Sequence, residues 1–454
     1  MTPSSDLESA SAHAVVAAIA AGRLSAREAC DAAIERIERL DGAINAVVVR
    51  DFERAREQAA ERDRQLARGE RLPLLGLPMT VKESFDVAGL PTTWGLEPFR
   101  GFVPKEDAAV VTRLKAAGAV ILGKTNVPPS LADWQSTNPI YGRTVNPFDA
   151  TRSPGGSSGG SAAALASNMV ALEFGSDIGG SIRVPAAFCG VFGLKPSFGL
   201  MPRRGHGFPG TDGAGIELAV VGPLARHVDD LELAFGVVAG PDAMDAVAWR
   251  AEPPAPRVRR VADCRLLVLD AHPRARTDSV IRDALANLCD DASRAGAKVA
   301  RESALLPDLD AAHDDYLKML GTILSRGAKG VQDVISAHEW FALLDRQLQV
   351  RRRWQGLFER FDAVVTPAFG TVAYPHVDTP DMRTSTLVID GQPTTYGAQV
   401  AWPGLATFAN LPATSAPIGR TASGLPIGAQ VIGAFLHDRT TMAIAGWLSA
   451  LHGR

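Results

Sequence analysis

Cysteine is scarce in this chain of 454 residues, and no two cysteines stand in a Cys-x-x-Cys spacing; the four are Cys30, Cys189, Cys264 and Cys289. Cysteines of a disulfide framework or a structural zinc site usually stand at close, regular spacings, so we expect neither in this chain. The histidines also lack a metal-binding pattern such as His-Glu-x-x-His. We therefore expect a protein that uses no metal and resides in a reducing compartment.

The chain also lacks a long hydrophobic run and an excess of one charge. The apolar stretch at residues 14–21 is too short to span a bilayer, and Asp6 and Glu8 stand where a secretory signal carries positive charge. A net charge of −3 predicts no basic surface for nucleic acid or an anionic membrane, and the basic run 351–353 is interpreted as a solvated helix face. These features favour a soluble, cytoplasmic protein that binds neither nucleic acid nor membrane.

What is present is a helical start followed by alternating elements. Residues 1–70 are typical of helices: Ser25 and Glu28 have the spacing of a capping box, and Ile34 and Ile37 follow at helical intervals. From Leu74 onward, short apolar runs alternate with helical segments, which indicates an α/β core with a mainly parallel or mixed sheet.

The remaining chain divides by composition. We expect a catalytic core over residues 74–240 and a surface connection, rich in proline and charge, over 240–262. The sheet then continues over 263–454, interrupted by a helical excursion near 305–360. Since no repeat of 20–50 residues is present, we expect one domain over residues 1–454 rather than a solenoid.

One stretch, "RSPGGSSGGS" at residues 152–161, admits several functions. A flexible linker is disfavoured because apolar elements lie close on both sides. A phosphate-binding loop needs a lysine after its last glycine, but Ser161 and Ala162 follow Gly160. The stretch also matches the Gly-x-Ser-x-Gly nucleophile elbow at Ser157, although the polar segment before it is a poor central strand.

The fourth interpretation depends on two distant segments. Ser181 lies in "GSDIGGSIRVPAAFCG", 24 residues after Ser157, and Lys82 lies in "GLPMTVKESFDV", 75 residues before it. With these segments in this order, the sequence resembles the amidase signature family of serine hydrolases. The resemblance extends through "FANLPATSAPIGRTASGLPIGAQVIG" near the C-terminus and is loosest over residues 240–360.

The resemblance implies a catalytic triad without histidine. Ser181 would be the nucleophile, Ser157 the bridging serine, and Lys82 the base. A lysine is a base only when neutral, so its pKa of about 10.4 must fall by several units, which burial in an apolar segment can cause. The chain has eight lysines beside 39 arginines, and arginine could not give up its proton.

The same resemblance implies the supporting parts of the site. Gly156 and Ser158 flank the bridging serine, and the peptide bond before Ser157 is expected to be cis. The backbone N–H groups of the run from Ile178 through Gly179 and Gly180 to Ser181 would form the oxyanion hole. For Asp177, a turn-forming role and direct participation are equally open.

Other residues received less specific interpretations. His206 is the one histidine near these segments in sequence, and we expect it to lie in a loop or line a pocket rather than to be a base. We expect a structural role for Lys124. The segment "VPPS" after "GKTN" departs from the family pattern and leaves the site entrance open. Trp134, Trp402 and Tyr396 fit either an acyl pocket or plain packing.

The family fold implied is a single large α/β domain with a central mixed, mainly parallel sheet of about eleven strands covered by helices. The implied function is an amidase without cofactor, monomeric or homodimeric, that cleaves a small amide, whether an aryl or alkyl amide or a carbamate. The alternatives are a glutamine-hydrolysing subunit of a tRNA amidotransferase, a scaffold without activity, and an α/β-hydrolase that uses Ser157 with a histidine base.

Overall fold

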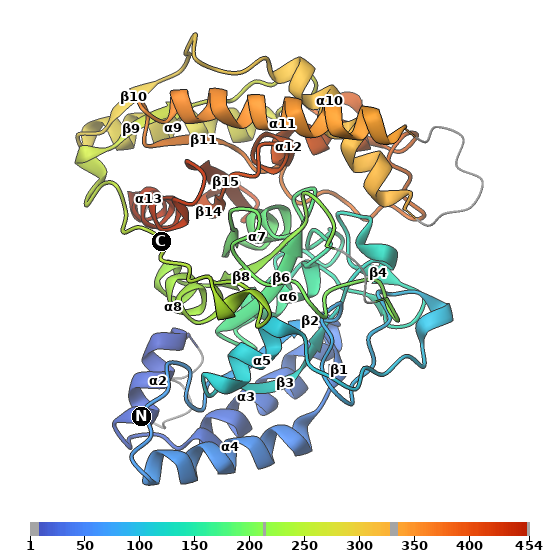
Figure 1. The fold of residues 1–454 in the computed structure, drawn as a ribbon, viewed down its shortest axis with the longest axis vertical. Coiled ribbons are helices and arrows are strands. Elements are labelled where there is room, and N and C mark those ends of the chain that lie inside the picture. The colour runs from blue at the N-terminus through green and yellow to red at the C-terminus, as the bar shows by residue number, and fades with distance from the viewer. Residues whose placement is uncertain (1–8, 212–214, 327–334, 452–454) are drawn as a thin grey trace.

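The computed structural model describes residues 9–211, 215–326 and 335–451. Figure 1 shows the N-terminal helices at one end of the molecule, the strands through its middle, and α10 and α11 at the other end. The longer helices of the described residues are α2 (Ala12–Ala20), α3 (Ala26–Leu40), α4 (Phe52–Ala67), α5 (Ala109–Ala116), α6 (Gly159–Ala166), α7 (Arg183–Cys189), α8 (Val228–Val238), α9 (Ser279–Arg294), α10 (Leu309–Leu324), α11 (Ala337–Leu357), α12 (Ala401–Phe408) and α13 (Asp438–Leu451).

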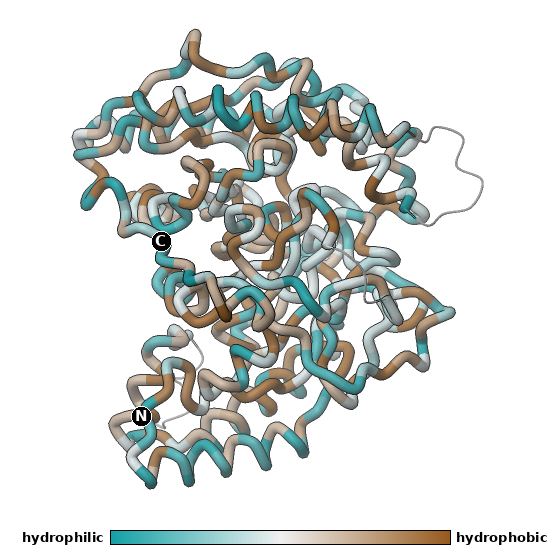
Figure 2. Tube along the Cα trace, in the orientation of Figure 1, coloured by the Kyte–Doolittle hydropathy of each residue, from teal (hydrophilic) through white to brown (hydrophobic). Residues whose placement is uncertain are grey.

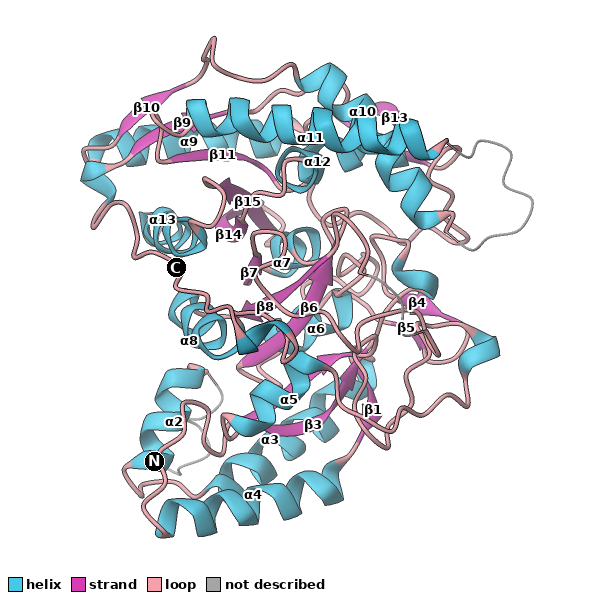
Figure 3. Cartoon of the chain, viewed as in Figure 1, coloured by secondary structure: helices cyan, strands magenta, loops and turns pink. Residues whose placement is uncertain are grey.

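Within the described residues, the strands form one large sheet and three small ones (Figure 3). The eight strands of the large sheet are, in spatial order, β10 (Lys298–Ala300), β9 (Arg265–Val268), β11 (Ala363–Pro367), β15 (Pro426–Ile432), β14 (Ala413–Arg420), β7 (Phe192–Lys195), β8 (Val220–Ala225) and β6 (Leu172–Asp177). A three-stranded sheet has the order β1 (Val47–Arg50), β3 (Val120–Thr125) and β2 (Pro78–Lys82). Two hairpins complete the set, β4 (Thr137–Asn138) with β5 (Gly142–Arg143) and β12 (Thr386–Ile389) with β13 (Gln392–Thr395).

The directions of the strands correct one expectation. The α/β class and the mixed sheet are confirmed, but in the large sheet only β10–β9 and β9–β11 are parallel, and the other neighbours are antiparallel. Helix α9 crosses from β9 to β10 and leaves that pair parallel, whereas a short turn joins β14 to β15 and forces an antiparallel return. About eleven strands were expected in one sheet. The structure instead has eight strands in the large sheet and three in a separate sheet, with no ladder of hydrogen bonds between these two sheets in the described residues.

Several elements begin and end where the residues predict. The capping box of Ser25 and Glu28 is present at the start of α3, which buries Ile34 and Ile37. Gly118 has a φ of +99° and follows the end of α5, a left-handed conformation that glycine adopts most readily. Local sequence thus sets these boundaries.

The hydrophobic core joins both ends of the chain. One cluster of buried apolar side chains includes residues of α2 and α3 together with residues of α13. Figure 2 shows the outer helix α4 as mostly hydrophilic, with hydrophobic residues gathered toward the interior. Strands β2 and β6 are buried at every position, so the polar side chains that they carry lie inside the protein.

Candidate active site

A fully buried lysine ends strand β2. Lys82 has no exposed surface, and its Nζ lies 2.6 Å from Ser157 Oγ and 3.0 Å from Ser176 Oγ. Burial lowers the pKa of Lys82 to about 7, although the negative charges of Asp177, Glu173 and Glu83 oppose this shift. Near neutral pH the amine is therefore divided between its protonated and neutral forms.

The loop that carries Ser157 is held by close backbone approaches. The peptide bond between Gly156 and Ser157 is cis, as expected. A Cβ atom at position 156 would overlap the carbonyl oxygens of Gln135 and Asp133, which explains a glycine at this position. After Ser157, the N–H of Ser158 donates to the carbonyl of Ser181 over 3.1 Å, so the two serine loops lie against each other.

Ser181 lies in the turn between β6 and α7 and is 6% exposed. Asp177 organises this turn, because its carboxylate accepts hydrogen bonds from the N–H groups of Gly180 (2.9 Å) and Ile182 (3.0 Å). The same carboxylate pairs with the buried guanidinium of Arg183 at 2.8 and 3.0 Å. Burial by itself would raise the pKa of Asp177, but Arg183 outweighs it, and the pKa is lowered to about 2.

The backbone amides of this turn are unequal. The N–H of Gly180 is already donated to Asp177, whereas no acceptor within the described residues is recorded for the N–H groups of Ile178, Gly179 and Ser181. Within the described residues, no hydrogen bond joins the hydroxyls of Ser157 and Ser181. The structure thus joins Lys82 to Ser157 by side chains and Ser157 to Ser181 by their loops.

Two polar residues on β6 are part of this site and were not found from the sequence. Ser176 shares Lys82 Nζ with Ser157, and Glu173 accepts a hydrogen bond from Thr80, two residues before Lys82 on β2. Burial raises the pKa of Glu173 to about 8. The signal was available in the polar residues inside "LEFGSD", but only the adjacency of β2 and β6 gives it meaning.

The less specific predictions have separate outcomes. His206 is buried with its Nε2 3.0 Å from Ser84 Oγ, and burial lowers its pKa well below the ordinary value. Lys124 donates to the carbonyl of Pro91 and the hydroxyl of Thr92. These contacts fit structural roles for both side chains.

The three aromatic candidates lie in two different clusters of buried side chains. Trp134 and Tyr396 lie edge to face, with ring centroids 5.2 Å apart, beside the turn that carries Ser181. Trp402 packs in a different cluster, against His272. Trp134 therefore contacts the turn directly, and Tyr396 adjoins it through Trp134.

The elbow interpretation of Ser157 does not fit this surrounding. Residues 144–156 form a loop with isolated bridges rather than a strand, and the recorded side-chain partner of Ser157 is Lys82 rather than a histidine. A nucleophile elbow needs a strand that runs directly into the serine.

Two other kinds of feature are absent from the part of the chain that the structure describes. Over residues 9–211, 215–326 and 335–451, no group of three or more metal-binding side chains is present. Within the same described ranges, no helix has the length and apolar composition needed to cross a membrane.

Comparison with known proteins is consistent across sequence and structure. A model of the Amidase family matches residues 28–322 and 314–442. The 1-carboxybiuret hydrolase subunit AtzE of Pseudomonas sp. (strain ADP) is 36% identical over 448 residues, which cover 92% of this chain and 94% of that protein. The putative amidase AmiB2 of Mycobacterium tuberculosis (strain ATCC 25618 / H37Rv) is 35% identical over 98% of this chain and 96% of its own.

A solved structure agrees with these relatives. It comes from a study of a vestigial protein complex and the origins of an s-triazine catabolic enzyme, and it superposes with a TM-score of 0.82 at 32% identity. The superposition covers 98% of this chain and 99% of that one. The chain belongs to the amidase signature family and is an amidase, a hydrolase that acts on amide C–N bonds.

Proposed function

We propose that this amidase works through an acyl-enzyme on Ser181, with Lys82 as the base and Ser157 as the relay between them. The observation that supports this most directly is the 2.6 Å contact between Lys82 Nζ and Ser157 Oγ, at a lysine whose pKa is lowered to about 7 by burial. A neutral amine in this position can take a proton from a hydroxyl, which an ordinary surface lysine cannot do at pH 7.

In each half of the reaction, one proton passes from the attacking group through Ser157 to Lys82 and is then returned to the leaving group. Ser181 Oγ attacks the amide carbonyl while its proton passes to Ser157, and the proton of Ser157 passes to Lys82. The tetrahedral oxyanion is held by the N–H groups of Ile178, Gly179 and Ser181, since that of Gly180 is donated to Asp177. Return of the proton to the leaving nitrogen breaks the C–N bond and leaves an ester on Ser181.

Hydrolysis of that ester repeats the sequence with water. The water gives its proton through Ser157 to Lys82 as its oxygen attacks the ester carbonyl. Collapse of the second tetrahedral intermediate returns the proton to Ser181 and releases the carboxylic acid. In this mechanism the hydrogen bond between Ser157 and Ser181 forms when substrate orders the site, because catalytic bonds often tighten only in the complex.

The substrate that fits this site is a small amide with an aryl or alkyl acyl group, or a carbamate. Support comes from the buried apolar and aromatic cluster beside the Ser181 turn, which includes Trp134, Phe369, Tyr396 and Val400. The proposal treats residues 1–454 as one cytoplasmic domain that is active as a monomer or homodimer. Catalysis without partner proteins separates it from a glutamine-hydrolysing amidotransferase subunit.

Covalent labelling tests the nucleophile. A fluorophosphonate should form an adduct on Ser181 in the purified protein, identified by peptide mass spectrometry, and the labelling rate should fall sharply in Lys82→Ala. An adduct on Ser157 instead would overturn the assignment in favour of the elbow. A labelled protein inert to aryl, alkyl and carbamate substrates, but active on glutamine with added partner subunits, would support the amidotransferase alternative.

The pH dependence of kcat/KM tests the base. Only neutral Lys82 accepts a proton, and its pKa is lowered to about 7, so kcat/KM should rise about tenfold per pH unit below that value and level off above it. The measurement is a profile of kcat/KM from about pH 5 to about pH 10, with circular dichroism to verify folding at each pH. A limb centred near the ordinary lysine pKa of about 10.4 would contradict the proposal.

A further inference from the structure

We infer that Tyr316 and Trp134 are positioning residues that hold the turn Ile178–Ser181 in the geometry of an oxyanion hole. This inference rests on the proposed function of that turn. Tyr316 comes from α10, in the part of the chain that resembles the family least, and Trp134 comes from the loop before β4.

The contacts are made to consecutive carbonyl groups of the turn. The hydroxyl of Tyr316 donates to the carbonyl of Ile178 over 2.9 Å, and the indole Nε1–H of Trp134 donates to the carbonyl of Gly179 over 2.8 Å. In a trans peptide unit the C=O and N–H point in opposite directions. Fixing the Ile178 carbonyl therefore aims the Gly179 N–H away from Tyr316, and fixing the Gly179 carbonyl aims the Gly180 N–H toward Asp177.

The turn needs such external anchors because of its composition. Gly179 and Gly180 have no side chains that could pack and limit their backbone angles, and Gly180 has a φ of +97°. Asp177 restrains the far side of the turn through the Gly180 and Ile182 amides. Without the two anchors on the near side, the peptide unit that offers the Gly179 N–H could rotate.

Both anchors are themselves rigid. Trp134 is 4% exposed and meets Phe369 with ring centroids 5.0 Å apart. Tyr316 is 1% exposed, and a Cβ at position 404 would lie 2.8 Å from its ring, so the glycine there makes room for the phenol.

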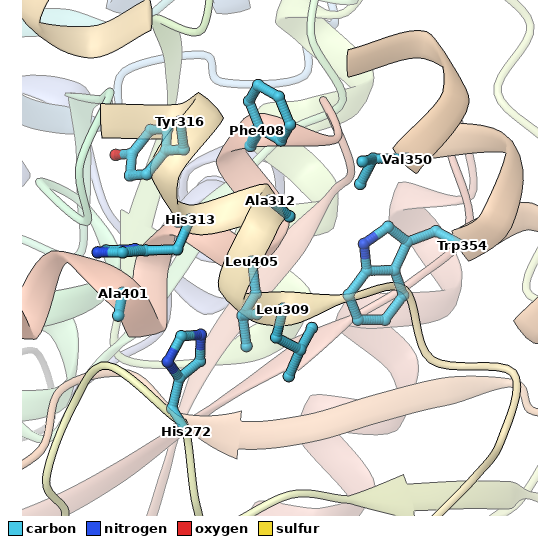
Figure 4. A pocket seen from close by; sticks show the side chains of 11 residues that line it. His272, Leu309, Ala312, His313, Tyr316, Val350, Trp354, Ala401, Leu405 and Phe408 are labelled. Carbon is cyan, nitrogen blue, oxygen red and sulfur yellow. The ribbon is translucent and has the colours of Figure 1, made fainter. Parts of the chain in front are cut away.

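The space behind the Tyr316 ring is also restricted. Figure 4 shows the ring on α10 beside a small cavity bordered by His313, Leu405 and Phe408. These side chains, together with the backbone of Gly404, pack around the phenol and favour the position in which its hydroxyl meets the carbonyl of Ile178.

The consequence for catalysis is electrostatic preorganisation. Donors that already face the position of the developing oxyanion lose no energy to reorientation when the charge forms. Loss of an anchor should affect the transition state and leave the binding of the uncharged amide unchanged. This separation of kcat from KM distinguishes positioning from a general role in folding.

The test uses Tyr316→Phe, which removes one hydroxyl, with Thr322→Val as the matched control. Thr322 lies on the same helix, α10, and its hydroxyl donates to the carbonyl of Lys318 rather than to the turn. On a 4-nitroanilide substrate, Tyr316→Phe should lower kcat about tenfold with KM within about twofold of wild type, while Thr322→Val keeps the wild-type values. The Ki of 2,2,2-trifluoroacetophenone, whose adduct with Ser181 carries an oxyanion, should rise by the same factor as kcat falls.

Trp134→Phe provides a second variant if the first does not fold. Because Trp134 also belongs to the cluster proposed to receive the acyl group, its readout is the fall in kcat and the matching rise in Ki, and KM is not used. Wild-type kcat and Ki in a folded Tyr316→Phe or Trp134→Phe would overturn the inference, as would equal losses in Thr322→Val. A wild-type enzyme that is not labelled at Ser181 would instead overturn the proposed function itself, so the two failures are distinguishable.

Discussion

Replacing Ser181 by alanine is expected to lower kcat for amide hydrolysis by about 10⁵- to 10⁶-fold, the loss typical of a serine nucleophile. Lys82→Met should cause a loss of similar size, because the proton relayed from Ser181 through Ser157 then has no amine to receive it. The double variant should be no worse than either single one, since residues that act as one unit give non-additive losses. Single-turnover kinetics would measure the loss of activity in each variant, and mass spectrometry would show whether an acyl-enzyme forms.

The control for this series is Ser167→Ala, which makes the same change at the end of α6. The buried Ser167 Oγ has no recorded hydrogen-bond partner, so its removal should leave kcat unchanged.

Lys82→Met should also leave the protein folded. The folded pKa of about 7 lies below the ordinary value, so the unfolded chain binds more protons between these two values, and Lys82 lowers stability as pH falls through that window. Additive losses in the double variant would separate the two residues mechanistically.

Replacing Arg183 by methionine is expected to lower the free energy of unfolding by about 3–5 kcal/mol, the range found when one partner of a buried ion pair is removed. The guanidinium is fully buried and bonds Asp177, the carbonyl of Pro403 and the side chain of Gln430. Its loss leaves the Asp177 carboxylate in the interior without its cation. The pKa of Asp177 should then rise, and the carboxyl should hold the Ser181 turn less firmly.

Urea unfolding monitored by circular dichroism measures this change. The matched control is Arg100→Met, which breaks the exposed pair with Glu97 and should change stability by less than about 1 kcal/mol. Equal effects of the two substitutions would contradict the argument, because burial is what separates them. Activity should fall in Arg183→Met even where the variant is folded, since Asp177 orders the turn that carries the proposed nucleophile.

How far the site could be predicted depended on whether a residue lies within a contiguous motif. Ser157, Ser181 and Lys82 stand in short segments that resemble those of the amidase signature family, so each could be named before the fold was known. Ser176 and Glu173 meet Lys82 and Thr80 only because β2 lies beside β6. Tyr316 reaches Ile178 from 138 residues away, which no local pattern announces.

By itself, the sequence determined the α/β class and the capping of α3, because these depend on periodicity and local spacing, which act over a few residues at a time. The residues expected to carry the chemistry followed from the resemblance of their segments to those of the amidase signature family. Only the tertiary structure decided the strand directions, the division of eleven strands between an eight-stranded and a three-stranded sheet, and the partners of the Ser181 turn. Those depend on which distant segments share a buried interior, where Lys82 loses its solvation and each polar group must find a partner.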